Sequence, residues 1–386
     1  MSRAEVLDRL RRSNLTLAVV VLGAATLLPF LFGPLDSFMN NAVLALAYVV
    51  MALGLNIVVG FAGLLDLGYV AFYAFGSYAV GWLASDFYAY INGGKGIHVL
   101  AASELSSPAG IHFNFLLIIV AAIVICAVVG ALIGLPTLRL RGDYIAIVTL
   151  AFGEIIRVFA FFGDDIHFGK HYLLTNGRQA ISPVDQIDLP AIKQFDSAFS
   201  LRPYYWFALA MVAFVLFVNF RLRDSRLGRA WIAIREDEVA AASMGVPLVR
   251  TKLLAYATGG ALGGMSGAFL GSYFNSVNAN QFQFGFSIFI LAMIILGGLG
   301  SIWGVVFGAV LLSYINTYFI PDVFNTLPSK VGLDFDLTQL SFGIFGFLIV
   351  LVMILRPEGI LPERRRKLEL VEGVGTGDEQ LFEVRA

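Results

Sequence analysis

Three ionisable residues fall inside stretches apolar enough to cross a membrane: Asp66, Glu154 and Arg157. At the centre of a membrane helix, each costs roughly 2.5 to 3.5 kcal/mol unless it faces the bundle interior, water or a partner. Glu154 and Arg157 are three residues apart and can pair, either as a structural clamp or as polar lining of a pathway. Asp66 stands among glycines in GLLDLG, which favours a broken or re-entrant helix beside a cavity.

A second group of residues that can do chemistry lies in the basic loop 221–250. Residues 236–238 put three carboxylates at the start of a short predicted helix, where the helix dipole favours them, and Gly245 with Pro247 ends it. Ala240 and Ala241 give this helix a small-residue face that suits insertion into a groove on another protein. The positive-inside rule alone explains the arginines but not the carboxylates and alanines. The candidate contact residues are Arg229, Arg235, Glu236, Asp237, Glu238, Ala240, Ala241 and Gly245.

Other chemistries lack their motifs. No stretch matches GxxxxGK[ST], so ATP hydrolysis by this chain is not predicted. Four histidines, at positions 98, 112, 167 and 171, fall in predicted outside loops without an HExxH motif or a cysteine partner, and we expect them on the surface. No Ser, His, Asp arrangement and no basic stripe with aromatics is present, so neither a hydrolase nor a nucleic-acid partner is predicted.

The composition indicates a membrane protein. Of 386 residues, 58% are hydrophobic and 14% charged, against roughly 45 to 50% and about 25% in soluble domains. Charge-free runs of about 20 residues predict an all-α polytopic fold with about ten membrane helices. They are expected near 15–33, 38–59, 64–84, 115–135, 143–162, 204–220, 251–275, 284–298, 302–320 and 340–356. Glycines at every fourth position from Gly259 to Gly271 predict close helix contacts.

Basic residues predict the orientation. With both termini in the cytoplasm, inside segments and their flanks hold 19 of the 26 Lys and Arg residues, and outside loops hold six. The predicted organisation is a cytoplasmic amino-terminal segment 1–14, a membrane domain 15–356 and a cytoplasmic tail 357–386. Two long outside loops, 85–114 and 163–203, are either solvated connectors or receivers of a soluble partner.

The loop resembles the coupling segment of ABC importer permeases, whose pattern is Glu-Ala-Ala, three residues, then Gly. Ala240, Ala241 and Gly245 keep that spacing, while Val239 takes the place of the glutamate and Glu238 lies one residue earlier. PTLRLRGDYIAIVTLAFGEIIR at 136–157 is similar to the hallmark of LivM-type branched-chain amino acid permeases. Further matching stretches are 63–78, 297–304 and 356–366.

The resemblance implies a permease subunit of an ABC importer that moves branched-chain or related hydrophobic amino acids across the bacterial inner membrane. Its implied partners are a LivH-type permease subunit, two ATP-binding subunits, a periplasmic amino-acid-binding protein and membrane lipid. ATP and Mg would bind to the ATP-binding subunits, and this chain would bind no cofactor or metal. Candidate pathway residues are Asp66, Gly68, Tyr144, Thr149, Glu154 and Arg157.

Two alternatives remain at this point. Related permeases carry urea, short amides or other amino acids, so the resemblance leaves the substrate open. An ion-coupled secondary carrier with Asp66 and Glu154 as proton or sodium sites belongs to a different class. The absence of a convincing inverted repeat disfavours it.

Overall fold

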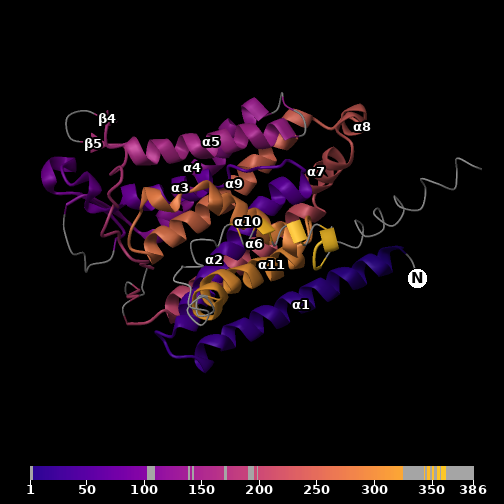
Figure 1. The fold of residues 1–386 in the computed structure, drawn as a ribbon, viewed down its shortest axis with the longest axis horizontal. Coiled ribbons are helices and arrows are strands. Elements are labelled where there is room, and N and C mark those ends of the chain that lie inside the picture. Colours follow the sequence, from indigo (N-terminus) through magenta and orange to yellow (C-terminus); the bar gives the residue numbers. More distant parts are fainter. Residues whose placement is uncertain are drawn as a thin grey trace, which may run out of the picture.

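The computed structural model is a bundle of helices with small strand elements at one end (Figure 1). It describes residues 3–101, 109–137, 140, 143–168, 172–189, 195–197, 199–324 and parts of 343–361. The α-helices are α1 Arg3–Leu31, α2 Ser37–Leu55, α3 Val70–Leu83, α4 Phe115–Thr137, α5 Asp143–Phe162, α6 Arg202–Asp224, α7 Arg226–Glu236, α8 Glu238–Ser243, α9 Leu248–Tyr273, α10 Phe284–Gly297 and α11 Ile302–Tyr314. Two π-helices continue earlier spans, η1 Asn56–Phe61 after α2 and η5 Ile315–Phe324 after α11.

Short elements connect the helices. The 3-10 turns are η2 Asp86–Tyr88, η3 Ile91–Gly94 and η4 Ala279–Gln281, and the strands are β1 Ala84–Ser85, β2 Ile97–Val99, β3 Ile111–Phe113, β4 His167–Phe168 and β5 Tyr172–Leu173. The first sheet has the order β1-β3-β2, in which β3 is antiparallel to β1 and parallel to β2. Strands β4 and β5 form an antiparallel pair.

The described residues contain six helical segments long and apolar enough to cross a membrane, together with three shorter apolar helices. All nine coincide with predicted segments. The predicted tenth segment, 340–356, and the tail 357–386 fall mostly outside the described residues. One prediction needs correction. The third helix was expected from residue 64, but residues 62–69 are not helical and α3 begins at Val70.

Helix α9 is the centre of the bundle, and its glycines explain why. It packs against α2, α3 and α4. A Cβ at Gly76 of α3 would lie 2.8 Å from the Cα of Gly264, and a Cβ at Gly271 would lie 3.4 Å from the Cα of Ser77. The predicted glycine contacts are therefore present, since small residues let helix backbones approach where lipid gives no hydrophobic drive.

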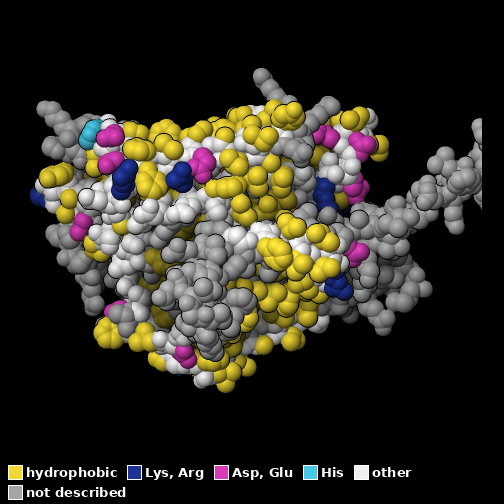
Figure 2. Space-filling view, in the orientation of Figure 1, with side chains coloured by type: hydrophobic (Ala, Val, Ile, Leu, Met, Phe, Trp, Pro, Cys, Tyr) yellow, Lys and Arg dark blue, Asp and Glu magenta, His cyan; other side chains and the backbone are white. Residues whose placement is uncertain are grey.

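The two ends of the bundle differ. Helices α7 and α8 and the amino-terminal end of α1 lie at one end, while β4 and β5 lie at the other (Figure 1). Hydrophobic side chains form broad areas between the ends, and most charged side chains in view lie toward the ends (Figure 2). Residues 3–14 and loop 221–250, which the sequence predicts on the same side of a membrane, lie at the same end of the bundle.

Candidate functional site

The segment between α6 and α9 forms the short helix α8, and both of its ends are fixed. Its first turn is capped by the Asp237 carboxylate, which accepts hydrogen bonds from the N–H groups of Val239 and Ala240 at 2.8 and 3.0 Å. Beyond its last residue, Gly245 has a φ of +83°, a conformation that favours glycine. The predicted end at Gly245 is therefore present, and Asp237 and Glu238 lie at the start as predicted. The prediction for Glu236 is wrong, because it is the last residue of α7 and Asp237 separates the two helices.

The exposed face of α8 differs from the predicted one. The sequence placed Ala240 and Ala241 on one small-residue face, but Ala241 is buried and only Ala240 is exposed. Val239 in the first turn and Met244 just beyond the last are also exposed, at 66% and 86%. The alanine spacing does not predict these two side chains, because the packing of α8 against α7 and α9 decides which of its residues are exposed.

Two contacts fix α7 and α8 to the start of α9. Lys252 is buried, and its Nζ lies 2.7 Å from Oε1 of Glu238. The indole N–H of buried Trp231 donates to the carbonyl of Thr251 at 2.7 Å. Glu238, the displaced glutamate of the loop, therefore neutralises a buried lysine, and α7, α8 and the first turn of α9 form one unit.

Arg235 joins this unit to the end of the second span. Its guanidinium donates a hydrogen bond to the carbonyl of Gly60 in η1. Its aliphatic stem packs on Gly63, where φ is +70° and a Cβ would lie 2.7 Å from Cγ of Arg235. Arg229 on the same helix instead donates to the carbonyl of Asp224 at 2.8 Å, so only Arg235 contacts the end of the second span.

Residues 62–69 interrupt the membrane helix, and side chains satisfy their backbone groups. The N–H of Leu67 donates to the hydroxyl of Thr149 at 3.0 Å, and the N–H of Gly68 donates to the Asp66 carboxylate at 2.8 Å. Thr149 lies six residues into α5, about 9 Å along the helix axis. Non-helical backbone at such a depth is tolerated where protein buries it, as here. The broken helix predicted around Asp66 is therefore present.

Asp66, Gly68 and Thr149 come together against α5. A Cβ at Gly68 would lie 2.8 Å from the carbonyl carbon of Thr149, and one at Gly153 would lie 3.1 Å from the Cα of Gly68. Asp66 is 1% exposed, so it faces packed protein rather than the expected cavity. Its Oδ2 accepts no hydrogen bond from the described residues. A buried carboxylate oxygen without a donor is costly, which marks this break as a point of strain.

The other three candidate pathway residues lie on a different face of α5. Arg157 Nε and Glu154 Oε2 are 2.7 Å apart, so the predicted pair forms. It is not inside this chain's bundle, because the two side chains are 37% and 35% exposed. Tyr144 is 68% exposed. The structure thus divides the six residues into a buried cluster and an exposed face.

An apolar cleft of about 220 Å³ lies between α1, α2, α6 and α11. Its wall includes Leu46, Tyr205 and Trp303, and it contains none of the candidate pathway residues. No charged side chain lines it, so it has nothing to pair with the ammonium or carboxylate of an amino acid. Within the part of the chain that the structure describes, no group of His, Cys, Asp or Glu side chains is arranged to hold a metal ion.

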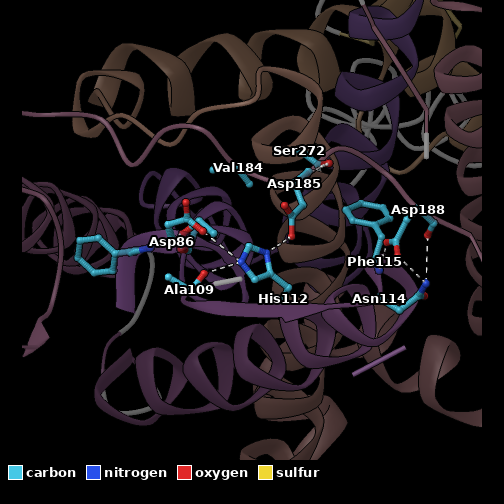
Figure 3. A network of polar contacts seen from close by, with 12 residues as sticks. Asp86, Ala109, His112, Asn114, Phe115, Val184, Asp185, Asp188 and Ser272 are labelled. Carbon is cyan, nitrogen blue, oxygen red and sulfur yellow. Dashed lines mark hydrogen bonds and ion pairs between the residues drawn. The ribbon is translucent and has the colours of Figure 1, made fainter. Parts of the chain in front are cut away.

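At the opposite end of the bundle, His112 ties the two outer loops together (Figure 3). Its Nδ1 lies 2.6 Å from Oδ2 of Asp185, and its Nε2 lies 2.8 Å from the carbonyl of Ala109 and 3.2 Å from Oδ1 of Asp86. The carbonyl of Asp185 also accepts a hydrogen bond from Ser272 of α9. The expectation that every histidine lies on the surface is wrong for His112, which is 2% exposed because it sits between two carboxylates.

This network is expected to weaken at high pH. Burial lowers the pKa of His112, but hydrogen bonds with Asp185 and Ala109 and the charges of Asp185 and Asp86 outweigh it and raise that pKa to about 9. Because the folded pKa exceeds the ordinary 6.5, the stabilisation is complete below that value and is lost as the pH rises through about 9. The melting temperature of the purified protein should exceed that of His112→Gln at about pH 7, and the gap should close near pH 10. A gap independent of pH would contradict the charged network.

The comparisons with known proteins agree with one family. The model for "Branched-chain amino acid transport system / permease component" matches residues 37–354. The chain is 33% identical over 357 residues to the LivM permease protein of Salmonella typhimurium and 34% identical to that of Escherichia coli, in each case covering 88% of this chain and 73% of the relative. It is 24% identical over 339 residues to the LivH permease protein of Escherichia coli, covering 85% of this chain and 95% of the relative. No solved structure matches.

The family match spans the helices that carry the broken span, α5 and the α7–α8 unit. Its apolar helices make the chain a multi-pass membrane protein. The chain therefore belongs to the family of permease components of branched-chain amino acid transport systems.

Proposed function

We propose that this chain is a permease subunit of an ABC importer that moves branched-chain or related hydrophobic amino acids across the bacterial inner membrane. Its relatives LivM and LivH are named as permease proteins of high-affinity branched-chain amino acid transport systems. In this proposal ATP and Mg are bound by two separate ATP-binding subunits in the cytoplasm, and a second, LivH-type permease completes the membrane part.

The observation that carries the proposal is the form of α8. It is capped at its start, ended by glycine, exposed along Val239, Ala240 and Met244, and fixed to α9 through Glu238. A short helix held in this way can enter a groove on an ATP-binding subunit and pass a displacement to its own chain without bending.

The path of that displacement follows the contacts. Movement of α8 carries α7 with it, and Arg235 pulls on the Gly60 carbonyl at the end of the second span. The next residues form the break at 62–69, which is bonded to Thr149 of α5. We assign the opening step of alternating access to this packed break, which would open toward the cytoplasm. Asp66 lies there, and its Oδ2 accepts no hydrogen bond from the described residues.

The outer loops are assigned to the periplasmic amino-acid-binding protein. His112 and Asp185 join the loop after α3 to the loop after α5, and Ser272 joins both to α9. A soluble protein that presses on this surface therefore acts on the helix at the centre of the bundle, which supports signalling from the outside to α8.

The test replaces Met244 with Glu in a complex reconstituted with its ATP-binding and binding proteins. Because Met244 is 86% exposed, the variant should insert normally yet lose tenfold or more of its ATP-driven uptake of leucine. Leu35→Glu, in the turn between α1 and α2 and 56% exposed, is the matched control outside both the α8 surface and the two outer loops, and it should transport normally. Binding protein loaded with a polar amino acid or urea measures the substrate preference.

Two results would overturn the proposal. Undiminished uptake by Met244→Glu would remove α8 as the docking element. Uptake of leucine by this chain without any ATP-binding subunit would instead indicate an ion-coupled carrier.

A further inference from the structure

Helix α5 is the least covered of the six long spans in the described part of the chain. Only 28% of its most apolar window is buried, against 33 to 78% for the other five. It packs on α3, α4, α10 and η4 along one side and runs along an edge of the bundle opposite α1 (Figure 1). Its other side, which we call the α5 face, is not covered by any other element of the described residues.

The α5 face is apolar at its ends and charged at its centre. Its exposed large hydrophobic residues are Tyr144, Ile147, Ile155, Val158, Phe159 and Phe162, between 45% and 68% exposed. Among them lies the Glu154–Arg157 ion pair, with both side chains more than a third exposed. Exposed apolar side chains on a membrane span suit lipid as well as protein, so the ion pair is the feature of this face that requires a polar neighbour.

The position of the pair in the membrane makes lipid an unsuitable neighbour. The midpoint of α5 lies between residues 152 and 153, which puts the Cα of Glu154 about 2 Å and that of Arg157 about 7 Å from it along the axis. With the midpoint of α5 placed at the bilayer centre, the hydrocarbon boundary lies about 15 Å from it. Glu154 therefore cannot reach the aqueous interface.

The Arg157 side chain does not extend toward the aqueous interface either. Its Nε is 2.7 Å from the Glu154 carboxylate, and its guanidinium carbon lies 5.8 Å from the centre of the Phe161 ring. Pairing lowers the cost of the two charges, but the exposed parts still require polar groups around them.

We propose that the α5 face binds the second permease chain of the transport system, and that this chain supplies polar groups at mid-membrane to the Glu154–Arg157 pair. The inference rests on the proposed function. A partner of this kind is favoured because one organism has two permease proteins, LivM and LivH, named for the same transport system and both similar to this chain over at least 85% of its length. Such a partner has a span at the same depth, which a soluble protein lacks.

The partner surface would also lie one helix away from the broken span. Thr149 and Gly153 contact residues 67 and 68 on the opposite side of α5. Opening of the break would therefore move the surface on which the second permease is bound. The pathway between two such chains would run along α5.

The experiment uses site-directed photocrosslinking in the assembled complex. The native cysteine is first removed as Cys126→Ala, and a benzophenone maleimide is attached to Phe159→Cys or, as a control on the opposite edge, to Val20→Cys, which is 67% exposed in the parent. Phe159→Cys should crosslink to a tagged, co-expressed second permease, and Val20→Cys should not. Crosslinks only to lipid, or only between two copies of this chain, would overturn the inference.

A probe at Met244→Cys in the same complex separates this inference from the proposed function. If that probe crosslinks to an ATP-binding subunit while the Phe159 probe fails to reach the second permease, the proposed function stands and the α5 interface is wrong.

The ion pair is tested by assembly rather than by folding. Glu154→Gln should reduce the second permease recovered with this chain at least tenfold, while Glu154→Asp retains most of it. The yield of this chain expressed alone should be similar for both variants, because the pair is not buried in the monomer. An equal loss of the chain expressed alone would mean that the pair acts only within this chain, and the proposed interface would fall.

Discussion

Replacing Arg235 with Met is expected to reduce ATP-driven transport tenfold or more while the complex still assembles. Met keeps an aliphatic stem against Gly63 but cannot donate to the carbonyl of Gly60. A hydrogen bond from a charged group contributes about 1.5 to 3 kcal/mol, and each 1.4 kcal/mol is a factor of about ten in an equilibrium. The variant should hydrolyse ATP without moving a corresponding amount of amino acid, because α7 no longer holds η1.

Arg229→Met is the matched control for this variant. It removes a guanidinium from the same helix, but that guanidinium bonds only to the carbonyl of Asp224 and does not reach the broken span. Transported leucine per ATP hydrolysed, measured in proteoliposomes, should fall for Arg235→Met and stay near the parent value for Arg229→Met. If the ratio of transported leucine to hydrolysed ATP is the same in both variants, Arg235 has no specific role in coupling.

Replacing Gly68 with Ala is expected to cost about 3 kcal/mol or more and to lower the yield of folded protein several-fold. The new Cβ would lie closer to the backbone of Thr149 than real contacts allow. Backbone atoms of α5 cannot rotate aside as a side chain can, so either α5 or the 62–69 segment must shift. The N–H of Leu67 would then lose its hydroxyl acceptor.

Gly23→Ala provides the comparison, since no atom lies within 4 Å of a Cβ placed there. Thermal stability of the purified protein and its membrane yield should be close to the parent for Gly23→Ala and clearly lower for Gly68→Ala. A Gly68→Ala variant with the parent's stability and transport would show that the break is not packed against α5 as described.

The sequence predicts the membrane helices well because their signal is local. A charge-free run of about 20 residues has few alternatives to a helix in lipid, since every backbone group must be satisfied within the segment. Nine predicted segments coincide with apolar helices of the structure for this reason. The third begins late, at Val70, because the N–H groups of Leu67 and Gly68 donate to the Thr149 hydroxyl and the Asp66 carboxylate instead of to helical carbonyls, and no local pattern encodes the contact with Thr149.

The structure places the candidate residues in separate groups, and that grouping was not predictable from the sequence. The caps of α8 follow from neighbouring residues, so Asp237 and Gly245 were predicted in their roles. The partners of Glu238 and Arg235 lie 14 and 175 residues away along the chain, and no local rule selects them.

The sequence by itself determined that this chain is an all-α membrane permease, which part of it resembles a coupling segment, and that Glu154 and Arg157 can pair. The membrane helices and the pairing follow from composition and from spacings of a few residues, which helix geometry converts directly into contacts, whereas the permease assignment and the coupling segment follow from the family resemblance. Only the tertiary structure decided that Asp66 is packed against α5 rather than open, that Ala241 turns inward while Met244 projects, and that the ion pair lies on the α5 face. Burial and exposure are set by which helices come together, and long-range packing around α9 fixes that.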